Sequence, residues 1–392
     1  MADAGRLASC AMRSSRRASL HRLALAGLAS PWFATWSWAA GEIVVAHIGP
    51  FSGPLAINGQ ANFVGAQAAF GAANAQGGVS GRRIRLLRED DTYKAAETVR
   101  LLRLVAERDK PVAFINLLGS ANAAAVLESK VLDEIAIPVI GLTPGADAFR
   151  EPGNRHLFHV QAGDSVQLRA VVQHLATVGL RRIAVVYQDN PFGKAGLAKI
   201  EQFAAESKLV VAGKATMALG AEDGKEAARQ LRSAEAQTYL MVLAPNSGAA
   251  FVRDVRAENP GVPIYGLSYV AADVIVAKAG VEHAAGVALA QVTPNPGAGG
   301  TRITREYRSD MQQFAPKDAK LSPLSLIGYL AARITLEGLR RAKSINPESL
   351  ETALRALHHD FGGYLVDFTD GRNVGSKKVD IGVIDRAGVL RY

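Results

Sequence analysis

Short apolar runs alternate with amphipathic segments along most of the chain. The runs are bounded by Gly, Pro or charged residues and predict strands at 43–48, 83–88, 112–117, 136–141, 182–187, 238–244 and 262–267. The segments between them follow the helical period; in Ala95–Asp109, for example, Val99 and Leu102 share one face. Helices are likewise predicted over Ser165–Val178 and Gly193–Ser207. This alternation predicts an α/β fold, with parallel sheets that helices cover on both faces.

Two breaks divide the alternation. The first is Leu157–Asp164, and the second, Ala288–Gly300, is rich in Pro and Gly. After the second break, Thr301–Lys343 is strongly helical, and the tail Phe361–Tyr392 predicts two or three strands. Two breaks and a strand-rich tail indicate two lobes that are joined by several crossings of the chain.

The loop after the first predicted strand has the composition of a ligand loop. Ile43–Ile48 runs into a stretch that contains three glycines and two prolines, and a helix is predicted to start near Gln60. Open α/β sheets hold ligands at the carboxyl ends of their strands. A chain that opens with such a loop directly after an export signal favours a solute-capturing protein over a metabolic enzyme.

The export signal is predicted in residues 1–40. A basic segment precedes the short apolar run Leu23–Phe33, which is too short for a membrane anchor. Ser37 and Ala39 then give the small-x-small pattern of a cleavage site. Cleavage near Ala39 or Ala40 would release the mature protein into the periplasm.

The export route and the true start stay open at this point. The pair Arg16-Arg17 fits both general secretion and twin-arginine export, and translation could start at Met1 or Met12. Cys10 is the only cysteine, so the mature chain has none. This excludes a disulfide, a thiol nucleophile and a zinc–cysteine site in the mature protein.

Composition indicates a globular protein of ordinary type. With 392 residues, 48% hydrophobic and 21% charged, the chain can bury a large core and has the length of two domains. The net charge is +9, but residues 1–39 hold five Arg and one Asp, which leaves +5 for the mature chain. Because the basic residues are spread out, we expect solvated faces and no nucleic-acid partner.

Several motifs, taken in order, resemble one known family. They are the segments 48–59 (IGPFSGPLAING), 74–81 (NAQGGVSG), 84–91, 137–141 (IPVIG), 185–193 (VVYQDNPFG) and 249–253 (AAFVR). The chain resembles the leucine/isoleucine/valine-binding type of periplasmic solute-binding proteins, the receptors of branched-chain amino-acid ABC importers. The resemblance spans Glu42 to Tyr392 and implies the type I fold, in which two doubly wound parallel-sheet lobes are joined by a three-crossing hinge.

The resemblance also implies the domain layout and the partners. Lobe 1 is expected at 41–160 plus 291–361, and lobe 2 at 161–290 plus 362–392. The lobes of such receptors close over a small-molecule ligand, and permease subunits in the inner membrane read the closed form. We therefore expect a monomer without a cofactor that captures a small carboxylate-bearing solute, either an amino acid or an aromatic or other organic acid.

In lobe 1, loops after successive strands supply the candidate ligand contacts. Ser120 follows the strand 112–117, at the start of a helix whose N–H groups suit a carboxylate, and Thr143 and Gly145 follow the strand 136–141. Ser120 and Thr143 are alternatively simple helix caps. Phe51 and Asn58 would line the floor of the site, and Asn58 stands where the resemblance implies an aromatic residue.

In lobe 2, the corresponding loops give four more candidates. Phe192 would cover the ligand, or it is a core residue of its own loop. Asn246 follows the strand 238–244, and Ser268 and Tyr269 follow the strand 262–267. Because the carboxyl ends of parallel strands meet at one edge, these side chains are expected to face the same site.

One departure from the family pattern bears on the ligand. Where the resemblance implies a carboxylate that pairs with the ammonium of an amino acid, this chain has Ser268, and neither Asp189 nor Asp273 is well placed to replace it. An unpaired ammonium in a closed site costs several kcal/mol. An acid without an amine is therefore a serious candidate beside an amino acid.

Enzymatic function is disfavoured. The first loop lacks the dinucleotide fingerprint G-x-G-x-x-G, no phosphate-binding loop is present, and the motif around Ser268 lacks the second glycine of an esterase elbow. His358 and His359 form a pair without further ligands at metal spacing, so no metal site is predicted. A periplasmic ligand sensor that reports to a signalling partner remains the main alternative to an importer receptor, because both use the same closure.

Overall fold

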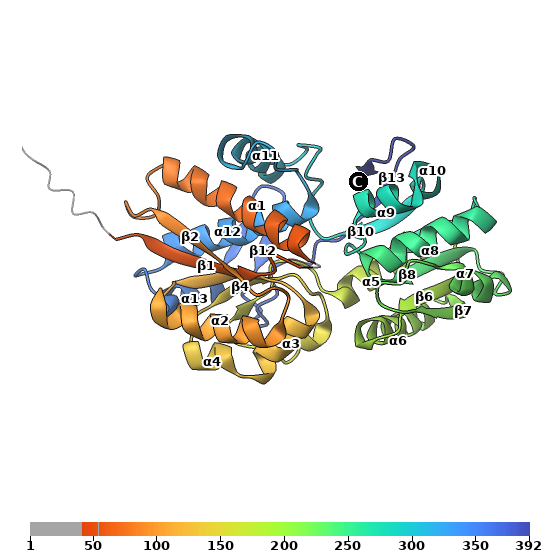
Figure 1. Ribbon diagram of the computed structural model, residues 1–392, viewed down its shortest axis with the longest axis horizontal. Coiled ribbons are helices and arrows are strands. Elements are labelled where there is room, and N and C mark those ends of the chain that lie inside the picture. The colour runs from red at the N-terminus through yellow and green to blue at the C-terminus, as the bar shows by residue number, and fades with distance from the viewer. Residues whose placement is uncertain (1–40, 54) are drawn as a thin grey trace, which may run out of the picture. The chain divides into compact units, whose positions relative to one another are not determined.

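The computed structural model describes residues 41–53 and 55–392. In this part of the chain the strands form a five-stranded sheet, a seven-stranded sheet and a small two-stranded sheet (Figure 1). Helices pack on both faces of each of the two larger sheets. The predicted α/β fold with two parallel-sheet cores is confirmed.

The five-stranded sheet has the order β2-β1-β3-β4-β5, and all its neighbouring strands run parallel. Its strands are β1 (Ile43–Gly49), β2 (Ile84–Asp90), β3 (Ala113–Leu117), β4 (Val139–Leu142) and β5 (Leu157–Phe158). The helices around it are α1 (Ala56–Ala75), α2 (Ala95–Arg108), α3 (Ser120–Glu128), α4 (Val131–Ile135), α11 (Arg302–Phe314), α12 (Pro323–Arg341) and α13 (Pro347–Arg355), with the short 3-10 turn η1 (Asp147–Phe149).

Alternating side chains of β1 fill the cores on the two faces of this sheet. Ile43 and Val45 pack with α1 and α12, whereas Ala46 and Ile48 pack with α2 and α3. Figure 1 shows α1 and α12 on one side of the sheet and α2, α3 and α4 on the other. Each side therefore buries its own apolar cluster, as the doubly wound arrangement requires.

Two glycines let α1 and α12 approach backbone to backbone. A Cβ at Gly65 would lie 1.8 Å from the carbonyl oxygen of Ser325, and a Cβ at Gly328 would lie 1.9 Å from that of Asn62. No side chain fits at either position without moving a helix. This close contact anchors α12 in the core of the first sheet, although α12 lies far from the strands of that sheet in sequence.

The seven-stranded sheet has the order β14-β13-β10-β9-β8-β6-β7, in which β6 to β10 run parallel and β13 and β14 are antiparallel additions. Its strands are β6 (Arg182–Gln188), β7 (Val210–Met217), β8 (Thr238–Val242), β9 (Ile264–Gly266), β10 (Val287–Gln291), β13 (Asp380–Ile384) and β14 (Leu390–Arg391). Its helices are α5 (Asp164–Thr177), α6 (Pro191–Glu206), α7 (Lys225–Arg232), α8 (Pro245–Glu258), α9 (Ala272–Ala279) and α10 (Val281–Ala284).

The described chain passes between the two large sheets three times. It crosses between β5 and α5, between β10 and α11, and between β12 (Leu365–Asp367) and β13. β12 pairs antiparallel with β11 (His358–Asp360), and Val366 lies in the core of the first sheet. The first two crossings coincide with the breaks predicted from the sequence, and the three crossings match the expected hinge.

The seven predicted strands are all present, with end points shifted by at most three residues. The sequence analysis missed β5, β7, β10 and β11. β5 lies inside the first predicted break, and β10 lies partly inside the Pro- and Gly-rich second break. The predicted helical stretch 301–343 divides into α11 and α12. Ala315 is extended, with ψ 162°, and it precedes Pro316, which disfavours helical backbone at the residue before it.

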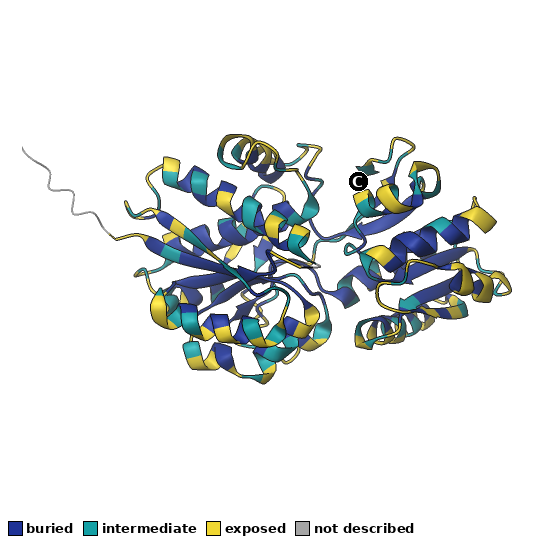
Figure 2. Cartoon of the chain, in the orientation of Figure 1, coloured by how far each residue is buried: buried dark blue, intermediate teal, exposed yellow. Residues whose placement is uncertain are grey.

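Burial follows this layering. The strands of both sheets are largely buried, and the outer faces of the helices carry the exposed positions (Figure 2). No helix among the described residues is both long and apolar enough to cross a membrane.

Candidate functional site

The carboxyl ends of β1, β3 and β4 share one edge of the five-stranded sheet. Leu117 pairs with Leu142 in the register of β3 and β4, so Ser120 and Thr143 follow neighbouring strand ends. In the seven-stranded sheet, the loops that precede α6 and α8 and the loop after β9 leave the corresponding edge. The predicted site residues therefore belong to the edges where open α/β sheets hold ligands.

Phe51 is a packed residue of the loop after β1. The residue is 6% exposed, and its ring makes T-shaped contacts with His47 and Phe63, at centroid distances of 5.1 and 5.6 Å. The Arg88 guanidinium lies 4.3 Å from the ring centroid, and the Phe51 N–H donates to Asp90 Oδ1 at 2.9 Å. These contacts hold the loop in place; a contact between Phe51 and ligand stays a prediction.

Asn58 lies in the first turn of α1 and not in the preceding loop. The helix begins at Ala56, four residues before the predicted start near Gln60. The sequence gives no start signal here, because the N-cap is Leu55, whose side chain cannot cap a helix. Asn58 is half-buried, and it remains a candidate ligand contact from the helix end.

Ser120 is the exposed first residue of α3. The N-cap of this helix is Gly119, with φ 101°, and the first N–H groups receive no side-chain cap. Ser120 is thus not the cap that the alternative interpretation proposed. Tyr93 lies beside this turn, because a Cβ at Gly119 would meet Tyr93 Cε2 at 2.5 Å. Ser120 and Tyr93 together border an uncapped helix end, which favours an anion.

Thr143 and Gly145 lie in a loop fixed by hydrogen bonds. The Thr143 hydroxyl accepts a hydrogen bond from Asn62 Nδ2 at 3.4 Å, and its carbonyl accepts one from Gln161 Nε2 at 2.9 Å. A Cβ at Gly145 would lie 1.8 Å from the Tyr269 hydroxyl oxygen and 2.1 Å from Asp164 Oδ1. Only glycine fits at position 145, since backbone there touches two side chains that belong with the seven-stranded sheet.

Asp164 is a candidate site residue, because it contacts two of the predicted site residues, Tyr269 and Gly145, and sequence reasoning missed it. It is the first residue of α5, 9% exposed, and its Oδ1 accepts a hydrogen bond from the Tyr269 hydroxyl at 2.5 Å. Burial raises the pKa of the Asp164 carboxyl to about 6, against the opposing effects of the Tyr269 hydrogen bond and the Arg150 charge. The available signal was an acidic residue at the end of the first break, directly before a predicted helix.

Arg150 contributes a buried positive charge near this carboxylate. Its Nη1 donates to the carbonyl oxygens of Pro144 and Ala146, each at 3.2 Å, while Nε and Nη2 have no partner among the described residues. Burial lowers the pKa of Arg150, although the charges of Tyr269 and Asp164 favour its ionised form. Through these two hydrogen bonds the guanidinium stabilises the 144–146 loop.

The predicted residues of the second sheet differ in their surroundings. Phe192, in the first turn of α6, makes a T-shaped contact with Tyr269 at a centroid distance of 6.0 Å. The Ser268 N–H donates to Gln167 Oε1 of α5 at 3.0 Å. Asn246 is exposed in the first turn of α8. The structure thus brings Gly145 and Tyr269 together at Asp164, with Phe192 against the Tyr269 ring, and among the described residues it shows no contact that joins Asn246 to them.

The whole described fold matches a known family. The family model described as "Periplasmic binding protein" matches residues 42–388. The chain belongs to this family of periplasmic binding proteins. The chain is 25% identical over 343 residues to Leu/Ile/Val-binding protein homolog 7 of Brucella abortus, and the match covers 83% of each chain. The resemblance to the leucine/isoleucine/valine-binding type is thereby confirmed.

Solved structures of periplasmic binding proteins share the fold of this chain. An extracellular ligand-binding receptor from Verminephrobacter eiseniae has a TM-score of 0.82 and 32% identity, and the match covers 90% of this chain and 100% of that one. A fatty acid ABC transporter substrate-binding protein from Thermomonospora curvata shares the fold, with a TM-score of 0.77, 20% identity and coverage of 89% and 91%. These relatives are binding proteins, and membership implies export to the periplasm. The expected signal, residues 1–40, lies outside the described residues.

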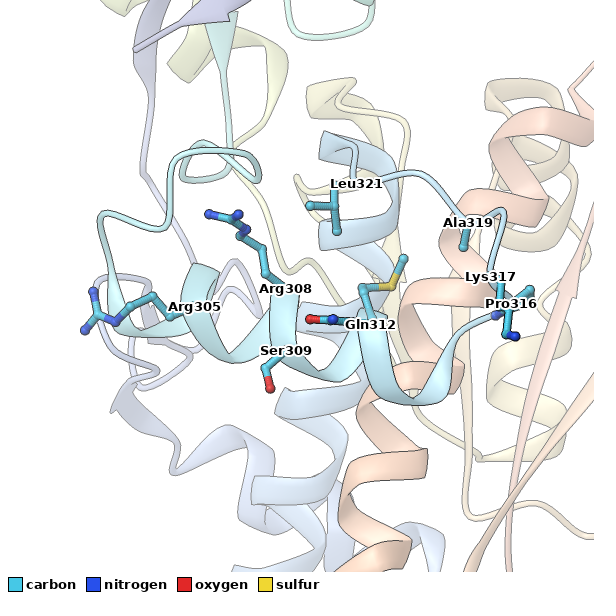
Figure 3. Close-up of a pocket in the computed structure, with 9 residues that line it drawn as sticks. Arg305, Arg308, Ser309, Gln312, Pro316, Lys317, Ala319 and Leu321 are labelled. Carbon is cyan, nitrogen blue, oxygen red and sulfur yellow. The ribbon is translucent and has the colours of Figure 1, made fainter.

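A hollow of about 630 Å³ lies away from the candidate site of this periplasmic binding protein, against α11 and the loop that leads to α12 (Figure 3). It is lined by Arg305, Arg308, Ser309, Met311, Gln312, Pro316, Lys317, Ala319 and Leu321. The sticks in Figure 3 show Arg305 and Lys317 at opposite ends, so their charges do not converge on one point. Over residues 41–53 and 55–392, no three His, Cys, Asp or Glu side chains form a potential metal site.

Proposed function

We propose that this periplasmic binding protein is the substrate-binding component of an ABC importer, and that it captures a small carboxylate-bearing solute by closure of its two lobes. The name of the Brucella relative, a Leu/Ile/Val-binding protein homolog, supports a solute of this size and chemistry. Permease subunits in the inner membrane are the proposed partners. The name of the Thermomonospora neighbour, a fatty acid binder, supports a carboxylate as the common feature.

The observation that carries the proposal is the uncapped start of α3. Gly119 supplies no capping side chain, and the exposed Ser120 hydroxyl stands at the first turn. Neighbouring β4 ends in the loop of Thr143 and Gly145. N–H groups, a hydroxyl and the positive end of a helix dipole at one sheet edge suit a carboxylate.

Lobe closure is supported by the chain path. Three segments connect the two large sheets, and such segments can absorb a hinge rotation while each lobe stays rigid. Residues near both strand-end edges already touch, since the Asp164 N–H donates to the Gly145 carbonyl at 2.8 Å. A ligand that contacts both edges would favour the closed state in proportion to its extra contacts there.

A thermal-shift screen tests the proposal. The protein, purified from the periplasm and refolded to remove any retained ligand, is exposed to aliphatic amino acids, aromatic acids, dicarboxylates and uncharged amides. A ligand at 100 times its Kd stabilises the folded state by about 2.7 kcal/mol, which gives a readable shift in Tm. We expect a shift with a carboxylate and none with its amide. Equal shifts with both, or none with any carboxylate, would contradict the proposal.

A further inference from the structure

We propose that Asn62 is a positioning residue for ligand capture. By donating a hydrogen bond to the Thr143 hydroxyl oxygen, it turns the hydroxyl proton away from itself and leaves that proton to the ligand carboxylate. The inference rests on the proposed capture of a carboxylate-bearing solute. Asn62 lies in the second turn of α1 and is fully buried, so it acts on the ligand only through Thr143.

Thr143 is held by three hydrogen bonds, and none of them uses its hydroxyl proton. Its N–H donates to the Leu117 carbonyl at 3.0 Å, and its carbonyl accepts from Gln161 Nε2 at 2.9 Å. Asn62 Nδ2 donates to the hydroxyl oxygen at 3.4 Å. A threonine hydroxyl has one proton to donate, and among residues 41–53 and 55–392 no protein group accepts it. This proton therefore stays available to a ligand.

Helix packing fixes the backbone of Asn62. The Asn62 carbonyl oxygen would lie 1.9 Å from a Cβ at Gly328, so α1 and α12 touch at this residue. Asn58 and Asn62 are four residues apart and share one face of α1. Asn58, a candidate ligand contact, lies one turn nearer the helix end that follows β1. Asn62 thus reaches Thr143 from a rigid helix whose same face leads toward the candidate site.

The direction of the Asn62–Thr143 hydrogen bond suits a carboxylate. Thr143 follows β4 and is half-buried, whereas Asn62 and Gln161 behind it are 0% and 1% exposed. An ionised carboxylate only accepts hydrogen bonds, whereas an amide also donates them. Because Asn62 already donates to the hydroxyl oxygen, Thr143 offers its proton to a carboxylate and has less to offer an amide N–H. Hydrogen bonds to an ionised acceptor are also the stronger kind.

A purely structural role explains Asn62 poorly. Its Oδ1 has no hydrogen-bond partner among the described residues, and a buried amide with an unpaired oxygen costs stability. Leucine, of similar size, would pack at this position without that cost. The side-chain hydrogen bond that Asn62 does make goes to a predicted ligand contact. We therefore expect Asn62→Leu to keep the Tm of the wild-type protein and to lose affinity.

Matched acid and amide probes test the inference. Isothermal titration measures the Kd of L-leucine against L-leucinamide and of hydrocinnamate against hydrocinnamamide. For an acid that binds the wild-type protein, Asn62→Leu should weaken binding at least threefold. Asn62→Asp, which replaces the donor by an acceptor of the Thr143 proton, should weaken it at least tenfold; the amides should change less.

The matched control is Asn74→Leu, about 18 Å along the same helix. Asn74 makes two hydrogen bonds with the backbone of Ile84, so its loss should lower the Tm and leave the Kd unchanged. Weaker acid binding in Asn62→Leu at an unchanged Tm would then be a local effect on the site. Unchanged acid binding in both Asn62 variants would overturn the inference, while the proposed function stands.

A double-mutant cycle separates positioning from a structural effect. Thr143→Val removes the hydroxyl and keeps the branched shape. In this background Asn62→Leu should change the Kd of the acid by less than twofold, because no hydroxyl is left to orient. An equal loss in both backgrounds would overturn the inference. If neither acid binds the wild-type protein, or if acid and amide bind alike, the inference and the proposed function are both overturned for these solutes.

Discussion

The Tyr269 hydroxyl donates a hydrogen bond to Asp164 Oδ1 at 2.5 Å, across 105 positions of sequence. The bond joins the loop after β9 to the first residue of α5. Gly145, from the loop after β4, packs against both side chains. Candidate ligand contacts near the edges of the two large sheets therefore share one buried carboxylate, and the first two predictions test this arrangement.

Replacing Asp164 should make stability less dependent on pH. Its folded-state pKa, about 6, lies above the reference value of 3.8, so the unfolded chain releases this proton first as pH rises. The stabilising contribution is complete below pH 3.8 and is lost as pH rises through 6, which costs up to about 3 kcal/mol at pH 8. Relative to wild type, Asp164→Asn should therefore be more stable at pH 8 than at pH 4.

Urea unfolding at the two pH values measures this difference. Three charged or titratable neighbours act on Asp164, namely Tyr269, Arg150 and Asp147, and all three remain in the variant. Asp273→Asn, at an exposed position of α9, serves as the control and should show a small and similar difference at both pH values. A constant difference between Asp164→Asn and wild type across this range would contradict the prediction.

Substituting Gly145 should disrupt the candidate site. The new Cβ of Gly145→Ala would lie 1.8 Å from the Tyr269 hydroxyl and 2.1 Å from Asp164 Oδ1, so these side chains or the loop must move. Overpacking of this kind costs about 1 to 3 kcal/mol. We expect a lower Tm and weaker binding of any ligand found in the screen. Gly261→Ala, with open space around it, should leave both unchanged.

His47 should make the protein sensitive to acid. It is fully buried in β1, neither ring nitrogen has a partner among the described residues, and burial lowers its pKa from 6.5 to about 3. The unfolded chain takes up this proton below pH 6.5, whereas the folded protein does so only near pH 3. Stability present above pH 6.5 is therefore lost as pH falls toward 3, by up to about 5 kcal/mol.

The variant His47→Phe tests this prediction. It keeps the aromatic packing with Phe51 and Phe63 but cannot titrate. The free energy of unfolding should fall less steeply between pH 6.5 and pH 4 than in wild type, with His159 still contributing its own lowered pKa. An unchanged slope in His47→Phe would mean that the pKa of His47 is the same in the folded and the unfolded chain, and would contradict the prediction.

The carboxylate site should depend on two hydroxyl groups. In the double variant Ser120→Ala, Thr143→Ala, we expect at least tenfold weaker binding of any carboxylate found in the screen, about 1.4 kcal/mol. Isothermal titration gives the Kd. The control variant Ser309→Ala, Thr177→Ala removes two exposed hydroxyl groups from α11 and α5 and should bind normally. Wild-type affinity in the first variant would remove Ser120 and Thr143 from the site.

The local pattern of the sequence determined much of this protein. Apolar runs and helical periods are properties of neighbouring residues, so they predicted the seven strands, the helices between them and the loops of Ser120, Thr143 and Tyr269. They also located two of the three segments at which the chain passes between the sheets. The start of α1 was misplaced because Leu55, its N-cap, carries no capping side chain.

Only the tertiary structure decided which of those loops meet. The approach of Asp164, Tyr269 and Gly145 depends on sheet order and on the path of three crossing segments, which bring together residues from three separate parts of the chain. The same holds for the helix contact at Gly65 and Gly328, where two backbones touch. Asp164 looks like an ordinary helix-start residue in sequence, and it becomes a buried, sparsely partnered carboxylate because distant segments exclude water from around it.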